Sequence, residues 1–202
     1  FGAELLDVDL AAADAEVIAE IVRVFETNGV LLVRDQKMNP DDLMRFLGSF
    51  GVLEDHTLKQ YTLPGYPKIF ILSNRVDGDG RPIGAHNDGI GWHTDYSYMA
   101  EPVKCTMLYA VEVPPEGSDT LVADCCGASL ALPAERQKQL AGLALHHSYK
   151  FFMETREHGR MQISKELEEA TPDVIHPLIR THPANGRKAL WPPPSTGGLM
   201  SS

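Results

Sequence analysis

The sequence predicts a mostly β domain with outer helices, an α+β fold for which a barrel or double-sheet roll fits best. Helical patterns are concentrated in the first 51 residues, strand-like runs dominate from residue 67 onward, and turn-rich segments separate those runs. The 202 residues are enough for one domain with a sizeable core, and we find no internal repeat in them.

The first 51 residues are expected to form strand, helix, strand and helix. Residues 1–10 are strand-like, and residues 14–29 form a helix that ends at Gly29. The apolar face of this helix comprises Val17, Ile18, Ile21, Val22 and Phe25. Residues 30–35 are an apolar run typical of a buried strand. A second helix is expected over residues 39–51, with Asn39 as N-cap and Pro40 in its first turn.

Strands are expected through most of the remaining chain. The runs are KIFILSN (68–74), WHTDYSY (92–98), KCTMLYAVEV (104–113) and DTLVAD (119–124), separated by turn-rich segments at 77–84 and 114–119. One helix is expected over residues 132–143, and the polar residues 154–173 are expected to be helical or mobile. Residues 176–191 predict a hairpin that turns at 183–186, because Asn-Gly supplies the positive φ angles of such turns.

Composition excludes several classes of partner and leaves the oligomeric state open. The formal net charge is −10 and the basic residues are scattered, which argues against nucleic acid. No apolar run is long enough to span a bilayer, so we expect no membrane association. Cys105, Cys125 and Cys126 are odd in number and two are adjacent, which argues against a disulfide framework and favours the cytoplasm.

His93 and Asp95 are the strongest candidates for chemistry. On a strand, residues two apart project to the same face, so an imidazole and a carboxylate can meet there. These groups suit a divalent metal, and with a second histidine they form the facial triad of non-haem Fe(II) oxygenases. A hydrogen-bonded surface pair is the alternative, since eight histidines produce such spacings by chance.

The wider context of this pair resembles a known enzyme family. The segment GIGWHTDYSY (89–98), followed by KCTMLYAVEVPPEGSDTLVAD (104–124), is similar to the taurine dioxygenase and 2,4-dichlorophenoxyacetate dioxygenase family of Fe(II)- and 2-oxoglutarate-dependent oxygenases. GAELLDVDL, NGVLLVRDQ, LGSFGVLEDH and HPLIRTHPANGRKAL extend the resemblance over nearly the whole chain. It implies a double-stranded β-helix (a cupin-like jelly roll) and a single dioxygenase domain over residues 1–202.

The resemblance also implies roles for individual residues. His93 and Asp95 match the iron-binding pair, and Thr120 matches the threonine that holds the far carboxylate of 2-oxoglutarate. His56 matches a residue that receives an acidic substrate, with Lys59 and Tyr61 as other candidates. The simpler alternatives are a strand threonine for Thr120 and a polar loop residue for His56.

One part of the family pattern is not found. The family completes its site with a second histidine far downstream, near an arginine that pairs with 2-oxoglutarate, and the WDNR motif around that histidine does not occur here. We therefore expect the domain to be incomplete at its C-terminus, and neither residue is assigned. Residues 152–173 suit a lid that closes over a bound ligand, as the family has in this region.

The implied activity is hydroxylation of a small anionic substrate by Fe(II), 2-oxoglutarate and dioxygen, with release of succinate and carbon dioxide. A sulfonate, a sulfate ester or an aryloxy acid would fragment after such a hydroxylation. Two alternatives stay open. One is a hydroxylase of an amino acid or another small acid that is not fragmented, and the other is a non-catalytic binding domain that has lost the complete iron site.

Overall fold

The structure is a computed structural model that describes residues 1–86, 88–156, 160–191 and 196–201, the last range by its backbone alone. The chain forms two compact units. Unit 1 comprises Phe1–Gly51, Lys104–Gln139 and Ile179–Trp191. Unit 2 comprises Val52–Val103, Leu140–Leu178 and Pro192–Ser202.

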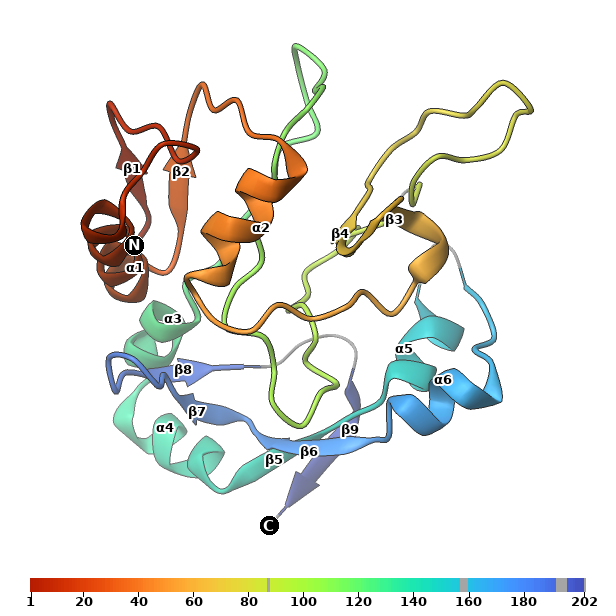
Figure 1. The fold of residues 1–202 in the computed structure, drawn as a ribbon. Coiled ribbons are helices and arrows are strands. Elements are labelled where there is room, and N and C mark those ends of the chain that lie inside the picture. The colour runs from red at the N-terminus through yellow and green to blue at the C-terminus, as the bar shows by residue number, and fades with distance from the viewer. Residues whose placement is uncertain (87, 157–159, 192–195, 202) are drawn as a thin grey trace. The chain divides into compact units, whose positions relative to one another are not determined.

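The start of unit 1 follows the expected order of strand, helix, strand and helix (Figure 1). Strands β1 (Ala3–Leu5) and β2 (Leu31–Val33) pair in parallel, and helices α1 (Ala15–Asn28) and α2 (Pro40–Gly48) follow them in alternation. Asp14 caps α1, and Gly29 ends it with a φ of 78°. Asn39 and Asp42 form a reciprocal capping box at the start of α2, with Pro40 in the first turn.

The core of unit 1 lies against the inner faces of these two helices. Its fully buried members are Leu10, Ile21, Met38 and Phe46. Ile18 and Phe50 pack against them, as the helical periodicity predicts. Val17 was expected on the same face of α1, but it is 39% exposed. The apolar stripe is therefore narrower than the sequence pattern indicates.

The rest of unit 1 contains two short helices and a hairpin. Helix α3 (Cys125–Ala131) was not predicted, whereas α4 (Ala134–Ala141) lies inside the helix expected over residues 132–143. Strands β7 (Ile179–Thr181) and β8 (Lys188–Leu190) pair antiparallel around the predicted turn, where Gly186 has a φ of 70°. The hairpin is thus confirmed, although it is shorter than residues 176–191.

The strands expected over residues 104–113 and 119–124 are wrong, because these residues form no ladder with another described segment. Cys105, Met107 and Tyr109 are partly buried and the residues between them are exposed, so residues 104–109 alternate as an extended strand does. The Tyr109 hydroxyl accepts a hydrogen bond from the Met38 backbone N–H at 3.0 Å. Side-chain packing, rather than cross-strand hydrogen bonds, holds this segment.

Unit 2 is built on one three-stranded antiparallel sheet in the order β6-β5-β9, with bounds Val174–Pro177, Leu143–His147 and Thr196–Ser201. Strand β5 leads into α5 (Tyr149–Thr155), and α6 (Lys165–Ala170) precedes β6 (Figure 1). A second, two-stranded sheet pairs β3 (Thr62–Leu63) with β4 (Tyr66–Phe70), next to the short 3-10 helix η1 (Lys59–Tyr61). The lid expected over residues 152–173 includes residues 157–159, which lie outside the described residues.

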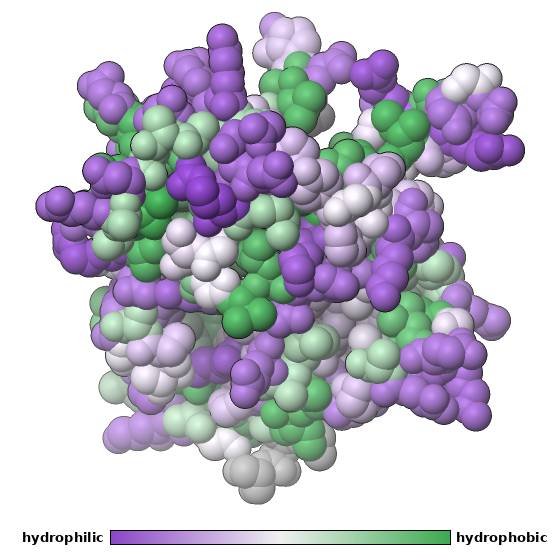
Figure 2. Space-filling view, viewed as in Figure 1, coloured by the Kyte–Doolittle hydropathy of each residue, from purple (hydrophilic) through white to green (hydrophobic). Residues whose placement is uncertain are grey.

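The core of unit 2 contains Leu58, Tyr149 and Met153, surrounded by partly buried aromatic and aliphatic side chains. Many other large hydrophobic residues reach the surface, as the green areas of Figure 2 illustrate. Across the described residues the strands form four small sheets and no closed barrel. The prediction of a strand-rich fold with outer helices is therefore confirmed only as a mixture of helices and small sheets.

Candidate functional site

Residues 88–99, which carry His93 and Asp95, form bends and turns rather than the strand expected over 92–98. The backbone angles explain the difference. Gly89, Gly91 and Tyr96 have φ values of 76°, 86° and 53°, all outside the β region. The turn ends where the Met99 N–H donates to the carbonyl of Tyr96 at 3.0 Å. A strand in this place is incompatible with these angles.

The His93 and Asp95 side chains nevertheless meet, as the spacing predicts. His93 Nε2 lies 3.3 Å from Asp95 Oδ1, and both side chains are about two-fifths exposed, at 39% and 41%. His93 Nδ1 lies 2.9 Å from the carbonyl oxygen of Gly91, which can only accept a hydrogen bond. A proton on Nδ1 satisfies this contact and leaves the Nε2 lone pair beside the carboxylate. A metal ion requires this tautomer.

Proximity to Asp95 also changes the acidity of His93. The hydrogen bond to the Asp95 carboxylate raises the pKa of His93 to about 9, against the opposing effect of desolvation. In the metal-free protein a proton therefore bridges the two side chains at neutral pH. A metal ion that binds both groups has to displace this proton.

His56 lies in the same unit and is electrostatically coupled to the pair. Its Nδ1 accepts a hydrogen bond from the Leu58 N–H at 3.1 Å, so the neutral ring carries its proton on Nε2. Burial lowers the pKa of His56, and the negative charges of Asp88 and Asp95 act in the opposite direction. The ring stacks on Phe70 with centroids 3.7 Å apart. His56 is therefore a neutral hydrogen-bond donor. It packs against the ring of Phe70, which forms an aromatic wall beside it.

Lys59 and Tyr61, the other candidates for substrate contact, lie in η1. Lys59 is exposed, and the Tyr61 ring packs edge-on against Phe70 with centroids 6.2 Å apart. Tyr61 thus shares the aromatic wall of His56, whereas Lys59 points to solvent.

Asp88 and Arg156 form an ion pair that sequence reasoning missed. The Arg156 Nη1 donates to Asp88 Oδ1 at 3.3 Å, and the two side chains are only 18% and 28% exposed. The Asp88 charge raises the pKa of His93, so this pair lies within electrostatic range of the metal candidates. The partners are 68 residues apart in sequence, and no local pattern links them.

Thr120 belongs to unit 1, unlike His93 and Asp95, and its role in binding 2-oxoglutarate stays a prediction. It is exposed and lies in the segment that forms no ladder. Arg180 and Arg187, also in unit 1, have structural contacts. The Arg180 guanidinium lies over the Trp191 ring at 4.0 Å, and Arg187 lies 3.9 Å from Asp124.

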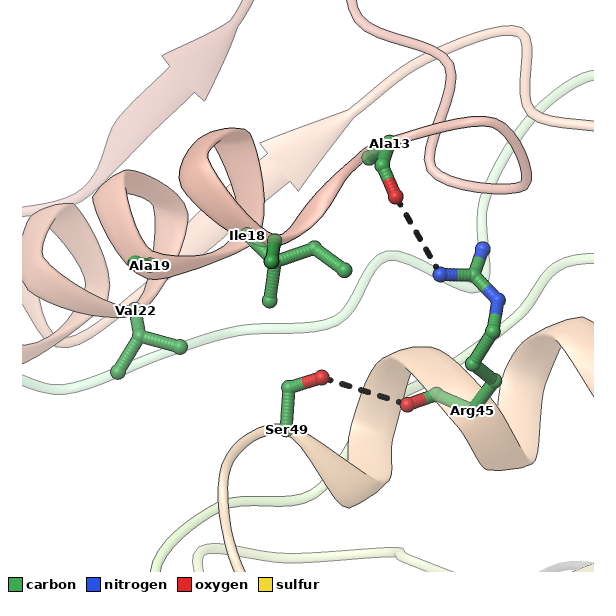
Figure 3. Close-up of a pocket in the computed structure, with 7 residues that line it drawn as sticks. Ala13, Ile18, Ala19, Val22, Arg45 and Ser49 are labelled. Atoms are coloured by element: carbon green, nitrogen blue, oxygen red, sulfur yellow. Dashed lines mark hydrogen bonds between the residues drawn. The ribbon is translucent and has the colours of Figure 1, made fainter.

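A hollow lies elsewhere among the described residues, between α1 and α2 of unit 1 (Figure 3). It has a volume of about 600 Å³ and is open to solvent. Its walls are small and aliphatic, and the Arg45 guanidinium at one end donates to the carbonyl of Ala13 at 3.4 Å. None of the predicted site residues lines it.

The donor set at His93 fits part of a metal site. An imidazole nitrogen and a carboxylate converge with the correct tautomer, as a borderline divalent metal requires. In the described part of the chain, no group of three or more His, Cys, Asp or Glu side chains is arranged to hold a metal ion. The geometry of the pair would suit two ligands of such a site, and further ligands would have to come from other groups.

Comparison with known proteins gives matches over nearly the whole chain. A family model described as "Taurine catabolism dioxygenase TauD, TfdA family" matches residues 1–200. An alpha-ketoglutarate-dependent 2,4-dichlorophenoxyacetate dioxygenase of Cupriavidus pinatubonensis is 33% identical over 204 residues, which cover 95% of this chain and 69% of that protein. An alpha-ketoglutarate-dependent sulfonate dioxygenase of Saccharomyces cerevisiae is 31% identical over 195 residues, which cover 94% of this chain and 45% of that protein.

A crystal structure of a taurine dioxygenase from Burkholderia xenovorans has the same fold as this chain. The TM-score is 0.72 at 22% sequence identity, and the match covers 100% of this chain and 63% of the crystallised one. The chain thus spans between 45% and 69% of the length of these three proteins. None of the helices in the described residues is both long and apolar enough to cross a membrane.

Proposed function

Because the chain belongs to the taurine catabolism dioxygenase TauD, TfdA family, as its sequence predicts, we propose that it is an Fe(II)- and 2-oxoglutarate-dependent dioxygenase that acts on a small organic acid. The observation that carries the proposal is the contact between His93 Nε2 and Asp95 Oδ1 at 3.3 Å. The Gly91 carbonyl orients the imidazole for metal binding, as a carbonyl partner does in known metal sites.

The chain's own residues have separate tasks in this reaction. Bound iron supplies a Lewis acid and a redox centre for the reaction of dioxygen with 2-oxoglutarate, which yields succinate and carbon dioxide. His93 and Asp95 would hold this iron through the imidazole Nε2 and the carboxylate. Thr120 donates its hydroxyl hydrogen to the far carboxylate of 2-oxoglutarate, because a carboxylate removed from water needs donors.

The substrate carries an acidic group next to an apolar body. Neutral His56 donates from Nε2 to that acidic group, because its Nδ1 is occupied by the Leu58 N–H. Phe70 and Tyr96 flank the His56 ring with centroids 3.7 Å and 6.0 Å away, and they supply an aromatic surface for the apolar body. A sulfonate, a sulfate ester or an aryloxy acid has this combination. Relatives named for 2,4-dichlorophenoxyacetate and for sulfonates support this class of substrate.

The fold we propose for residues 1–202 is a single dioxygenase domain of the double-stranded β-helix type. One family model matches residues 1–200, which supports a single domain. The TM-score of 0.72 to a taurine dioxygenase supports the same architecture. The expected cytoplasmic location and any homo-oligomer stay predictions.

The test is succinate release. Protein loaded with Fe(II) is incubated with 2-oxoglutarate, dioxygen and a panel of sulfonates, sulfate esters, aryloxy acids and amino acids. We expect substrate-dependent succinate from at least one of the first three classes, and loss of it in Asp95→Ala. Asp79→Ala is the matched control, because Asp79 is a solvent-exposed aspartate of the same unit. Succinate with amino acids alone would favour the hydroxylase alternative, and no succinate above background would favour a non-catalytic binding domain.

A further inference from the structure

The segment that carries the metal candidates receives little support from regular structure. Residues 88–99 belong to no described helix or strand, and no ladder hydrogen bonds join them to a sheet. A metal site, in contrast, needs ligands that are held within a fraction of an ångström. Side chains from other parts of unit 2 therefore have to hold this segment.

Arg156 contacts the segment at its start. Arg156 directly follows α5, and its backbone N–H donates to the carbonyl of Phe152 at 2.9 Å. Its guanidinium bonds Asp88 and also lies 5.8 Å from the centre of the Phe152 ring. Both members of the ion pair are less than one-third exposed, at 18% and 28%. For the exposed pair Arg81–Asp79 the values are 76% and 71%. Removal of Arg156 takes the charged partner of this ion pair away from the partly buried Asp88 carboxylate.

His176 contacts the segment at its end. It lies on β6, is buried, and its Nε2 is 2.9 Å from the carbonyl oxygen of Met99. Because a carbonyl oxygen can only accept, this nitrogen carries the proton. Met99 is also the residue whose N–H closes the turn after Asp95. The three-stranded sheet thus fixes the position at which this turn ends.

We propose that Arg156 and His176 are positioning residues for the metal centre. Through Asp88 and the Met99 carbonyl they hold the two ends of residues 88–99, so that His93 and Asp95 stay at the separation that a metal ion requires. The inference rests on the proposed metal site and adds two residues that contact neither metal nor substrate. Loss of an outer partner of this kind typically weakens metal affinity by about 10- to 100-fold.

The experiment measures Mn(II) binding by calorimetry and amide hydrogen exchange of the metal-free protein. Arg156→Gln should weaken Mn(II) binding by about 10- to 100-fold and speed exchange over residues 89–99, while exchange in β5 stays unchanged. Arg156→Lys should retain part of the Mn(II) affinity that Arg156→Gln loses. Lysine keeps the positive charge but lacks the planar guanidinium with its several N–H donors. The double variant with Asp88→Asn should lose less Mn(II) affinity than the sum of the losses in the two single variants, since both changes break the same ion pair. His176→Gln, whose amide can still donate, should bind more tightly than His176→Ala.

Arg81→Gln is the matched control, because it breaks an arginine–aspartate pair of the same unit that is largely solvent-exposed. It should leave Mn(II) affinity and exchange over residues 89–99 unchanged. Wild-type affinity and exchange in folded Arg156→Gln and His176→Ala would overturn the positioning role while leaving the metal site intact. Equal Mn(II) affinity of the wild type and Asp95→Ala would overturn the metal site itself, and the positioning role with it.

Discussion

Substitutions of Tyr149 can distinguish the stability contributed by ring packing from that contributed by a hydrogen bond, in the unit that carries His93 and Asp95. Its side chain is 4% exposed, and its ring lies 4.4 Å from that of Tyr98, which is three residues after Asp95. Its hydroxyl lies 3.3 Å from the Thr57 hydroxyl, and burial raises its pKa. Tyr149→Phe removes only the hydroxyl contact, whereas Tyr149→Ala removes the whole ring.

The structure predicts very different costs for the two changes. A distance of 3.3 Å is long for a hydroxyl–hydroxyl hydrogen bond, so Tyr149→Phe should lower the free energy of unfolding by only about 0.5 kcal/mol. Tyr149→Ala should lower it by about 3–5 kcal/mol, because an aromatic ring is lost from a core and Leu58 and Met153 are themselves buried there. The Ala variant should also bind Mn(II) more weakly, because Tyr98, which packs against Tyr96 next to Asp95, loses its contact with Tyr149.

Urea denaturation, followed by fluorescence and by circular dichroism, measures both costs. Val52→Ala is the control, because the Val52 side chain is 91% exposed and its truncation should change the free energy of unfolding by less than about 0.5 kcal/mol. A cost below about 1 kcal/mol for Tyr149→Ala, or equal costs for the two Tyr149 variants, would contradict the packing described here.

Three further predictions concern the metal pair and a helix start. Asp95→Ala should abolish tight Mn(II) binding, measured by calorimetry, and unaltered binding would exclude Asp95 as a ligand. An NMR titration of His93 in metal-free protein should give a pKa of about 9. This pKa is above the ordinary 6.5, so the stability that the pair contributes should be complete below pH 6.5 and lost as the pH rises through 9. A midpoint at 6.5 would show that Asp95 does not hold the proton. Asn39→Ala should lower the free energy of unfolding by about 1 kcal/mol, measured by urea denaturation, because it removes one half of the capping box with Asp42. An unchanged free energy of unfolding would mean that the capping box is not formed.

The helices at the start of the chain could be predicted closely because their signals are local. Asp14 and Asn39 cap helix starts with their own side chains, and Gly29 ends a helix at a φ of 78°. The turn at Asn185-Gly186 is local in the same sense, since Gly186 supplies its positive φ. Each of these signals lies within four residues of the boundary that it sets.

The strands could not be predicted as well, because a strand depends on a partner that is distant in sequence. Residues 104–109 alternate between partly buried and exposed, as the sequence pattern requires, and still join no ladder in the described part of the chain. Strand β5, in contrast, pairs with β6 and β9, which lie about 30 and 55 residues away in sequence. Period-two alternation thus predicts which face is buried, but it does not predict hydrogen-bonding partners.

The same distinction applies to the candidate site. The spacing of His93 and Asp95 is local and predicted their contact, although the strand assumed for it is not formed. Asp88 and Arg156 are 68 residues apart, and His176 is 77 residues from Met99, so only the folded structure brings them together. A candidate metal pair can thus be found from spacing, whereas the residues proposed to position it have no such signal in the sequence.

Tyr96 indicates why such positioning is needed. It is the residue after Asp95, it is not glycine, and its φ of 53° is unfavourable for an L-amino acid with a bulky side chain. A backbone of this kind persists only where its surroundings hold it, at a cost of about 1–3 kcal/mol. The Tyr96 ring is held between His56 and Tyr98, with centroids 6.0 Å and 5.7 Å away. Packing of these rings therefore offsets the strain that turns the chain after Asp95, so the aromatic side chains around His56 and the geometry of the His93–Asp95 pair depend on each other.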